Sequence, residues 1–303
     1  MAPSTGFRNG HAKNTVVDGF LALADEWIAR AVNDAGVAWY RRGVSDIVDA
    51  STDRPLAVAI GLAPRKLGKA DLVLDANEKA KAGALRSGLD LTEWSVDQLA
   101  RIAFMAASFT GDEEAFASRF DGFCATAEIN ELIALCRGLP LYPGATLLEP
   151  RAREAVRSGM KPVFEAIAHR NPYPAEIFSE DAWNQMVVKA FFIGSSLWPI
   201  QGLDRRANPH LARMLVGLAQ ERWAAGRPVS GEVWRCVAPH ADSEGQAALV
   251  HAFATGSEKE RLAIAYAMRS VDRSKMKIAS FQDEIISLQA RLTAENIGWS
   301  DLA

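Results

Sequence analysis

The chain has 303 residues, of which 49% are hydrophobic and 23% are charged, and its formal net charge is −3. These values are ordinary for a globular protein that buries a sizeable core, and the near-neutral charge argues against general nucleic-acid binding. No run approaches the roughly 18 apolar residues of a membrane span, and the polar residues 1–19 lack the apolar stretch of a signal peptide.

The three cysteines, Cys124, Cys136 and Cys236, are odd in number and far apart in the sequence. They therefore indicate neither a disulfide framework nor a zinc site. We expect a reduced, cytoplasmic compartment, three buried thiols and no bound metal or other cofactor.

Helical periodicity runs through almost the whole chain. Apolar residues recur at spacings of three and four in 16–32, 99–109 and 211–223. Segments 55–62 and 70–74 come nearest to strands, but they are rich in Ala and Leu and are predicted to form short helices. The predicted fold class is all-α.

Several helix boundaries are marked by local signals. Ser95 with Gln98, and Ser257 with Glu260, have the spacing of capping boxes, in which each side chain satisfies an unpaired backbone N–H group. Asn208 followed by Pro209 predicts a helix start, and Gly226 followed by a proline predicts a helix end.

Short helices joined by small loops suggest repeated antiparallel pairs. The pairs are 112–126 with 128–137, and the two halves of 243–269, a pattern typical of a HEAT-like α-solenoid or superhelical array, although no strict period is present. Prolines interrupt helicity near 140 and 172. We expect an N-terminal helical half (1–140), a loop-rich bridge (141–174) and a C-terminal half (175–303), which could also form one continuous domain.

The stretch 183–235 is the most informative part of the sequence. From Lys189 to Arg235 it carries seven basic and three acidic residues, a net charge of +4, so that the remainder of the chain carries about −7. A locally positive segment on an acidic body predicts attraction of an anionic ligand or partner.

Residues 202–209, Gly-Leu-Asp-Arg-Arg-Ala-Asn-Pro, concentrate polar groups between two apolar helices. Asp204 could pair with a nearby arginine and hold its guanidinium in place for a phosphate or carboxylate. The candidate ligand-binding arginines are Arg205, Arg206 and Arg213. The alternative is that these groups only brace a helix junction.

The helix after this loop offers further groups for binding. Its free N–H groups would favour an anion, with Asn208 as the cap and His210 in its first turn as a further polar group. Arg222 lies in its last turn, beside Trp223.

The preceding helix and the tryptophans complete the candidate site. Asn184, Gln185 and Lys189 share one predicted helix, and the spacing of four places Gln185 and Lys189 on one face. Trp198 and Trp223 would suit a ring-containing ligand, although large core residues remain the alternative. Lys189, within an apolar run, is either paired, extended to water or functional.

Catalytic and metal-binding patterns are absent from the sequence. It contains no GxSxG, Walker A, GxGxxG, HExxH or DDxxD motif, and the spacing of His240, Asp242 and His251 is not that of metal ligands. No catalytic residue is assigned.

Residues 183–240 resemble the EboA family, most specifically at GLDRRANPHLARM and at ERWAAGR. Members are helical proteins encoded in bacterial and algal ebo gene clusters, which are associated with the traffic or export of secondary metabolites. The family has no established catalytic residues to transfer, so the resemblance implies a pathway and not a mechanism.

Three functions are therefore open. The first is a non-catalytic component of metabolite traffic that binds an anionic or aromatic small molecule, or another ebo-cluster protein, around Lys189–Arg222. The second is an enzyme that uses Lys189 or His210 as acid or base beside an arginine-bound anion. The third is a protein–protein scaffold without a ligand site.

Overall fold

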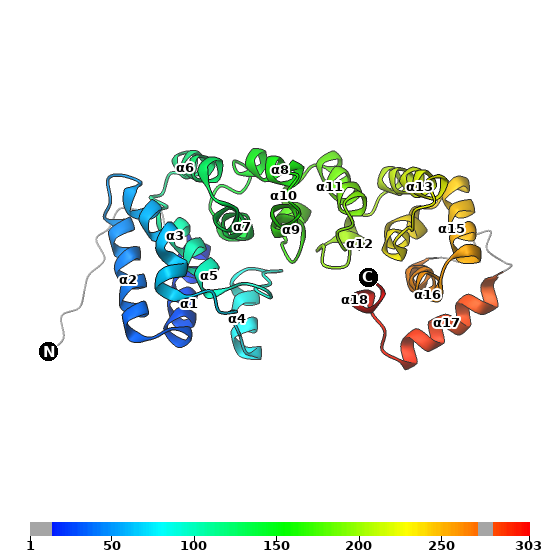
Figure 1. Cartoon of the computed structure of the whole chain (residues 1–303), viewed down its shortest axis with the longest axis horizontal. Helices are drawn as coiled ribbons and strands as arrows, with labels where there is room; N and C mark the ends of the chain where they lie inside the picture. The colour runs from blue at the N-terminus through cyan, green and yellow to red at the C-terminus, as the bar shows by residue number, and fades with distance from the viewer. Residues whose placement is uncertain (1–13, 272–280) are drawn as a thin grey trace. The chain divides into compact units, whose positions relative to one another are not determined.

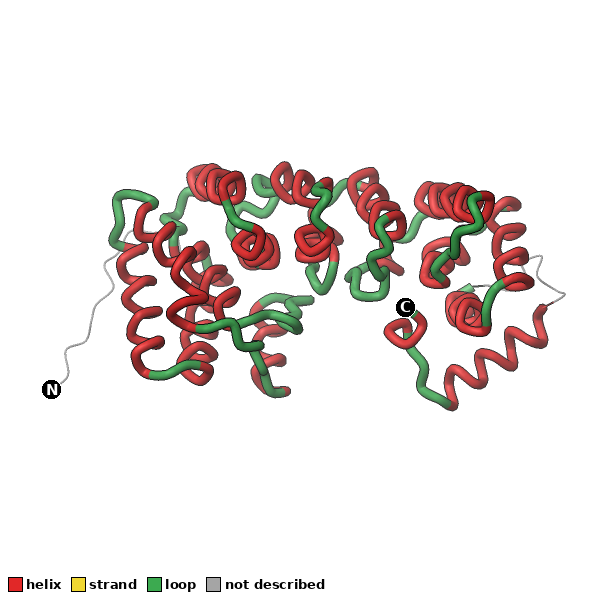
Figure 2. The backbone as a smooth tube through the Cα atoms, viewed as in Figure 1, coloured by secondary structure: helices red, strands yellow, loops and turns green. Residues whose placement is uncertain are grey.

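A computed structural model describes residues 14–271 and 281–303. Within these ranges the chain is all-α, as predicted, and its only β-type pairing is an isolated antiparallel bridge between Asp71 and Ser95. Figure 2 shows helices joined by loops, with no strand in the described part. Most of the N-terminal segment that bears on a signal peptide, residues 1–13, lies outside the described residues.

The chain divides into two compact units, Met1–Tyr173 and Pro174–Ala303, each with its own core (Figure 1). The helices of the first unit are α1 (Thr15–Ala31), α2 (Asp34–Val48), α3 (Arg54–Leu67), α4 (Ala76–Leu85), α5 (Val96–Ala107), α6 (Glu113–Thr126), α7 (Ile129–Arg137), the 3₁₀ turn η1 (Leu139–Leu141), α8 (Glu149–Arg157) and α9 (Lys161–Ala168).

Helix α10 (Tyr173–Ile177) spans the boundary between the units. The second unit then contains α11 (Glu180–Phe192), α12 (Leu203–Arg206), α13 (Pro209–Ala224), η2 (Gly231–Val233), α14 (Trp234–Val237), η3 (Ala238–His240), α15 (Ser243–Thr255), α16 (Glu258–Ala267), η4 (Met268–Ser270), α17 (Gln282–Ala294) and α18 (Trp299–Leu302).

Helix α5 forms the centre of the first unit. Every residue of α5 except Gln98 is buried, and the helix packs against α1, α2, α3 and α7. Its buried Arg101 pairs with Asp97 at 3.2 Å and donates to the carbonyl of Ile60, so the guanidinium is compensated inside the core. The predicted capping box at Ser95 and Gln98 starts this helix.

The core of the second unit is built around α14 and α16, which pack against each other. Trp234 and Cys236 from α14 are buried, and α16 buries a continuous run from Leu262 to Ala265. The capping box at Ser257 and Glu260 that was predicted from the sequence starts α16.

The predicted helix over residues 70–74 is wrong. Residues 141–174, the loop-rich segment expected between the two halves, contain helices α8 and α9. Residues 70–74 are extended, because Leu72 and Val96 exchange backbone hydrogen bonds with Trp94 and Ala70 across the isolated bridge. Within 141–174, Pro150 and Pro162 stand in the first turns of α8 and α9, where proline starts a helix instead of ending it.

Candidate functional site

The loop 202–209 is folded as a short helix, α12, that leads directly into α13. Gly202 has φ +77°, a left-handed conformation that lets the chain turn into α12, and a Cβ there would lie 2.8 Å from Cβ of Ala175. Asn208 then caps α13 as predicted, because its side-chain oxygen accepts from the N–H of Leu211 at 2.9 Å.

Arg206 is engaged inside the protein. Its Nη1 donates to the carbonyl oxygens of Pro174 and Ala175 at 3.1 and 3.2 Å, and its guanidinium lies 4.8 Å from the ring centroid of the buried Trp183. Burial lowers the pKa of Arg206, and the neighbouring charge of Arg205 lowers it further. This arginine braces the start of α10 against α12.

Arg205 has the opposite environment. It is exposed and makes no hydrogen bond or ion pair with any described residue, while its Nη2 comes within 3.2 Å of the position a Cβ on Gly202 would take. Its charge therefore has no counterion among the described residues.

The carboxylate of Asp204 pairs with Arg235, 31 residues away, and not with the neighbouring arginines suggested by the sequence. Arg235 makes two parallel bonds to it, with Nη2 to Oδ2 at 2.7 Å, and lies 5.4 Å from the ring centroid of Trp299. This pairing joins α12 to α14 and leaves Arg205 uncompensated.

Asn184 is buried and forms a reciprocal amide pair with Asn208, with distances of 2.8 and 3.3 Å. It therefore supports the loop and does not face the solvent beside Gln185. Gln185 is exposed, Lys189 is partly buried in the last turn of α11, and Phe192 is 65% exposed at the end of the same helix.

At the far end of α13, Arg222 and Trp223 contact other parts of the second unit. Arg222 donates to the carbonyl of Pro228 at 2.7 Å and lies over the ring of Phe191. Trp223 stacks on the buried Trp234 with ring centroids 6.0 Å apart, and meets His251 edge-on. Both side chains therefore contact residues around the C-terminal end of α13, several helical turns away from Asn208 at its N-terminal end.

His210 and Arg213 are exposed on the first half of α13. The imidazole of His210 makes no hydrogen bond or ion pair with the described residues. Arg213 borders a hollow of about 10 Å³, which has room for about one water molecule. Within the described ranges, no group of three or more His, Cys, Asp or Glu residues is arranged to hold a metal ion.

Two residues of the site were not singled out by the sequence, Arg235 and Glu232. Glu232 is buried and accepts backbone N–H groups of Leu197 and Trp198 at 3.0 and 2.5 Å, so it fixes the loop between α11 and α12. Their location in GEVWR, beside the aromatic Trp234, was the available signal, but nothing local indicated their partners.

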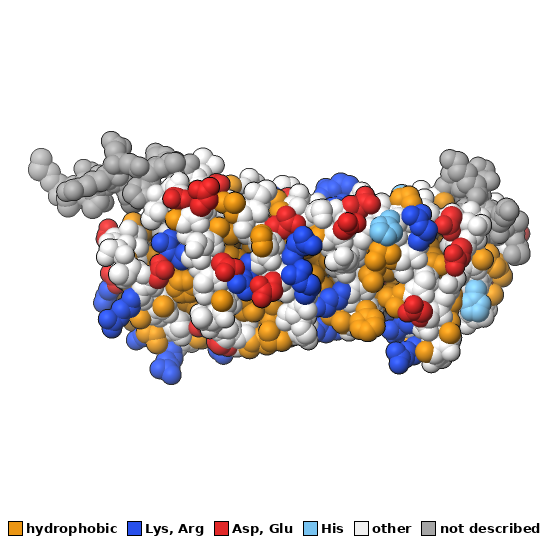
Figure 3. Space-filling model, turned by 90° about the horizontal axis from the view of Figure 1, so that it is seen from above, with side chains coloured by type: hydrophobic (Ala, Val, Ile, Leu, Met, Phe, Trp, Pro, Cys, Tyr) orange, Lys and Arg blue, Asp and Glu red, His pale blue; other side chains and the backbone are white. Residues whose placement is uncertain are grey.

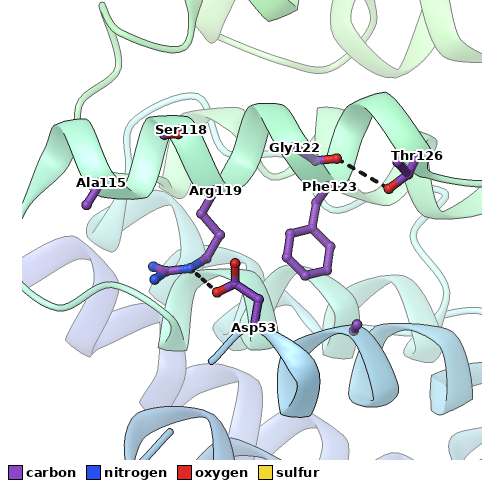
Figure 4. Close-up of a pocket in the computed structure, with 8 residues that line it drawn as sticks. Asp53, Ala115, Ser118, Arg119, Gly122, Phe123 and Thr126 are labelled. Atoms are coloured by element: carbon purple, nitrogen blue, oxygen red, sulfur yellow. Dashed lines mark hydrogen bonds and ion pairs between the residues drawn. The ribbon is translucent and has the colours of Figure 1, made fainter. Parts of the chain in front are cut away.

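Another hollow, of about 510 Å³, lies between α3 and α6 in the first unit. Figure 4 shows Arg119 from α6 and Asp53 pointing toward each other beside Phe123. Arg119 bonds Asp53 at 2.7 Å and the carbonyl of Ser108 at 2.8 Å, so the charge at this hollow is already compensated. On the face seen in Figure 3, basic and acidic side chains are likewise interspersed.

The three cysteines are free and buried, and burial raises the pKa of the Cys136 and Cys236 thiols to about 12. They are therefore poor nucleophiles. No helix in the described ranges combines the length and hydropathy needed to cross a bilayer.

Comparison with known protein families gives a match over most of the chain. The family model described as metabolite traffic protein EboA matches residues 20–238, which include most of the first unit and all of the second unit's helices from α11 to α14. No curated protein and no solved structure matches the chain.

Proposed function

Because the chain belongs to the EboA family of metabolite traffic proteins, we propose that it is a non-catalytic component of secondary-metabolite traffic that binds an anionic group beside α12. The observation that carries the proposal is the contrast between two adjacent arginines. Arg206 is used within the fold, whereas Arg205 is exposed and has no internal partner among the described residues.

The proposed binding surface consists of Arg205, residues that hold α12 in place, and neighbouring polar side chains that enlarge the surface. The bond between Asp204 and Arg235 and the pair of Asn184 with Asn208 hold α12 in place, so the guanidinium of Arg205 is presented from a braced turn. Binding an acid there requires little rearrangement of the protein, which favours affinity. His210 and Arg213 on the following helix extend the surface with further polar groups.

A partner protein is the second candidate for this surface. Gln185, Lys189 and Phe192 are spaced by four and three residues along α11, and Phe192 is 65% exposed. An exposed aromatic ring next to cationic groups is typical of a protein contact, and another ebo-cluster protein is the proposed partner.

The enzymatic alternative has less support. An acid–base role for Lys189 and His210 needs both groups at one reacting atom. The imidazole of His210 is exposed and has no hydrogen-bond partner in the described ranges, so nothing there orients it for proton transfer.

The paired helices and the free cysteines support two further proposals, one on the repeat architecture and one on the cellular compartment. We propose that contacting pairs such as α6 with α7, α8 with α9 and α15 with α16 are successive units of a HEAT-like array. We also propose a cytoplasmic location, which agrees with three free buried cysteines.

The test compares Arg205→Ala with Arg206→Ala in a strain that lacks the gene. Arg205→Ala is expected to abolish complementation and to leave the melting temperature near that of the wild type. Arg206→Ala is expected to lower the melting temperature, because about 1–2 kcal/mol of hydrogen bonding and cation–π contact is lost.

Arg227→Ala is the matched control, since Arg227 is an exposed arginine of the second unit outside the proposed surface. It removes the same charge and should complement normally. Full complementation by Arg205→Ala would refute the proposed binding role, whereas a large drop in its melting temperature would make Arg205 a structural brace.

A further inference from the structure

A second candidate site lies in the first unit, remote in sequence from α12. It is a cavity of about 260 Å³ between the segment before α5, the end of α7, and α9 with the loop that follows it. Its apolar wall is formed by Trp94, Ile133 and Pro162, and its polar groups include Arg137, Arg170 and His169. Neither the family match nor the sequence motifs assign a role to it.

Arg137 is the unusual group in this cavity, because it is a partly buried cation whose hydrogen-bond acceptors carry no charge. Its Nη1 donates to the carbonyl of Glu93 at 2.6 Å and to the side-chain oxygen of Gln98 at 2.5 Å, and both acceptors are neutral. Arg137 makes no ion pair within the described part of the chain. Burial lowers its pKa, as does the nearby Arg170, although Glu93 acts in the opposite direction.

The acidic groups around the cavity already have cationic partners. Glu93 lies 3.4 Å from Arg170, Asp90 lies 3.6 Å from the same guanidinium, and Glu165 lies 3.7 Å from Lys161. Arg170 is thus shared by two carboxylates, and Arg137 is the cavity arginine that has no ion pair among the described residues. A partly buried cation of this kind is stabilised by an anion that brings its own oxygen acceptors.

The backbone around the cavity is strained. Three non-glycine residues in the described ranges have positive φ, and two of them, Glu93 at 69° and Arg170 at 51°, line this cavity. Neither residue type favours the left-handed region, and such conformations persist where surrounding contacts impose them and are concentrated at ligand sites.

Contacts that impose the strained conformation are present. The amide of the buried Asn171 donates to the carbonyls of Cys136 and Ala166, and its oxygen accepts from the N–H of Tyr173. The carbonyl of Glu93 is held by Arg137. The strained conformations thus place the side chain of Arg170, and the carbonyl of Glu93 that accepts from Arg137, at the cavity wall.

We propose that this cavity binds the carboxylate or phosphate group of a small organic acid, with Arg137 as its charge partner and Trp94, Ile133 and Pro162 in contact with its apolar part. The volume is slightly below the roughly 300 Å³ at which pockets for drug-sized ligands begin, so the ligand is a single-ring or short-chain molecule. The site is independent of the surface proposed at Arg205.

The test is calorimetric titration of the full chain with phenyl phosphate, with benzoate and with neutral benzamide. Wild-type protein is expected to bind the two anions and not benzamide. Arg137→Gln is expected to weaken both anions by about tenfold or more, which corresponds to the loss of a charge-assisted hydrogen bond. Its melting temperature should not fall much, since the variant also removes a partly buried charge that has no ion pair among the described residues.

Two control variants separate this site from general charge effects and from the α12 surface. Arg157→Gln removes an exposed charge from the same unit and should bind the probes as wild type does, whereas Arg205→Ala removes any binding at the α12 surface and should retain the binding that Arg137→Gln weakens. A chemical-shift change at the Ile133 methyl group, assigned with Ile133→Val, would locate the ligand.

The proposal is overturned if wild type binds neither anion, if Arg137→Gln binds them as tightly as wild type, or if Arg157→Gln weakens them equally. Ala166→Val supplies a second test should Arg137→Gln fold poorly, because it narrows the cavity without altering any charge. Unchanged binding by that variant would also contradict the site.

Discussion

Glu232 is a buried carboxylate that supports the loop before α12. Burial raises the pKa of Glu232 above its usual value, although hydrogen bonds from Leu197 and Trp198 and the charge of Arg235 lower it. Folding therefore favours the protonated form of this carboxyl group. Its contribution to stability is fully present below its ordinary pKa of 4.5 and is lost as the pH rises through the folded-state value.

Glu232→Gln should remove this pH dependence, because an amide oxygen still accepts both N–H groups and does not ionise. Urea unfolding across the acid-to-neutral range is expected to show the variant gaining stability relative to wild type as the pH rises above about 4.5. Glu232→Ala should be about 1–3 kcal/mol less stable than Glu232→Gln at every pH, because two buried N–H groups lose their acceptor. A stability difference between the Glu232→Gln variant and wild type that is constant with pH would contradict the burial argument.

At the residue scale, the sequence predicts interactions between residues that are close in the chain and misses those between distant residues. The Asn208 cap was predicted because its signal lies within three residues of the N–H that it accepts. The partners of Asp204 and Arg206 were not, because Arg235 and the carbonyls of Pro174 and Ala175 lie about thirty residues away in the chain. Adjacent arginines with identical chemistry therefore could not be told apart.

At the element scale, the turn into α12 depends on Gly202. Gly202→Ala should destabilise the second unit by about 1–3 kcal/mol, since alanine disfavours φ +77° and its Cβ would meet Ala175. Thermal unfolding followed by circular dichroism measures this loss.

Gly217→Ala is the matched substitution within α13, where a Cβ meets nothing within 4 Å. It should stabilise the protein by about 0.5–1 kcal/mol, because alanine has the higher helix propensity. Equal effects of the two variants would show that the conformation of Gly202 does not limit stability.

The wrongly predicted helix over residues 70–74 is also explained by the contacts of a whole element. Ala- and Leu-rich composition favoured a helix over 70–74, but this segment bonds to the residues just before α5. Tertiary pairing outweighs propensity in so short a segment, since a few residues gain little from helical hydrogen bonds. The long helices were predicted correctly, because caps, regular apolar spacing and many helical hydrogen bonds all favour the same structure.

At the scale of the whole molecule, the all-α class followed from periodicity, whereas the first unit's cavity could not be foreseen. Arg137, Arg170 and Trp94 come from three separated segments, and no spacing rule connects them. The positive charge of 189–235 was visible in the sequence. The structure shows that much of it is taken up by Asp204 and by backbone carbonyls, which leaves Arg205, Arg213 and Arg227 exposed.

Two separate cores predict two unfolding transitions. Arg101→Met should lower one of them, because it leaves the buried Asp97 without its cation, a loss of about 3–5 kcal/mol in the first unit. Gly202→Ala should lower the other, since its effect falls on α12 in the second unit. Scanning calorimetry of the two variants and of the double variant measures both transitions in one protein.

The double variant is expected to show both shifts unchanged, each in its own transition, because sites with no shared contacts contribute additively. Each unit buries its own apolar helix, α5 in one and α16 in the other, so each has the driving force for a cooperative transition. If Arg101→Met and Gly202→Ala both displace one common transition, the two cores unfold as a single cooperative domain. The division of the structure at Tyr173 and Pro174 would then describe contacts without describing stability.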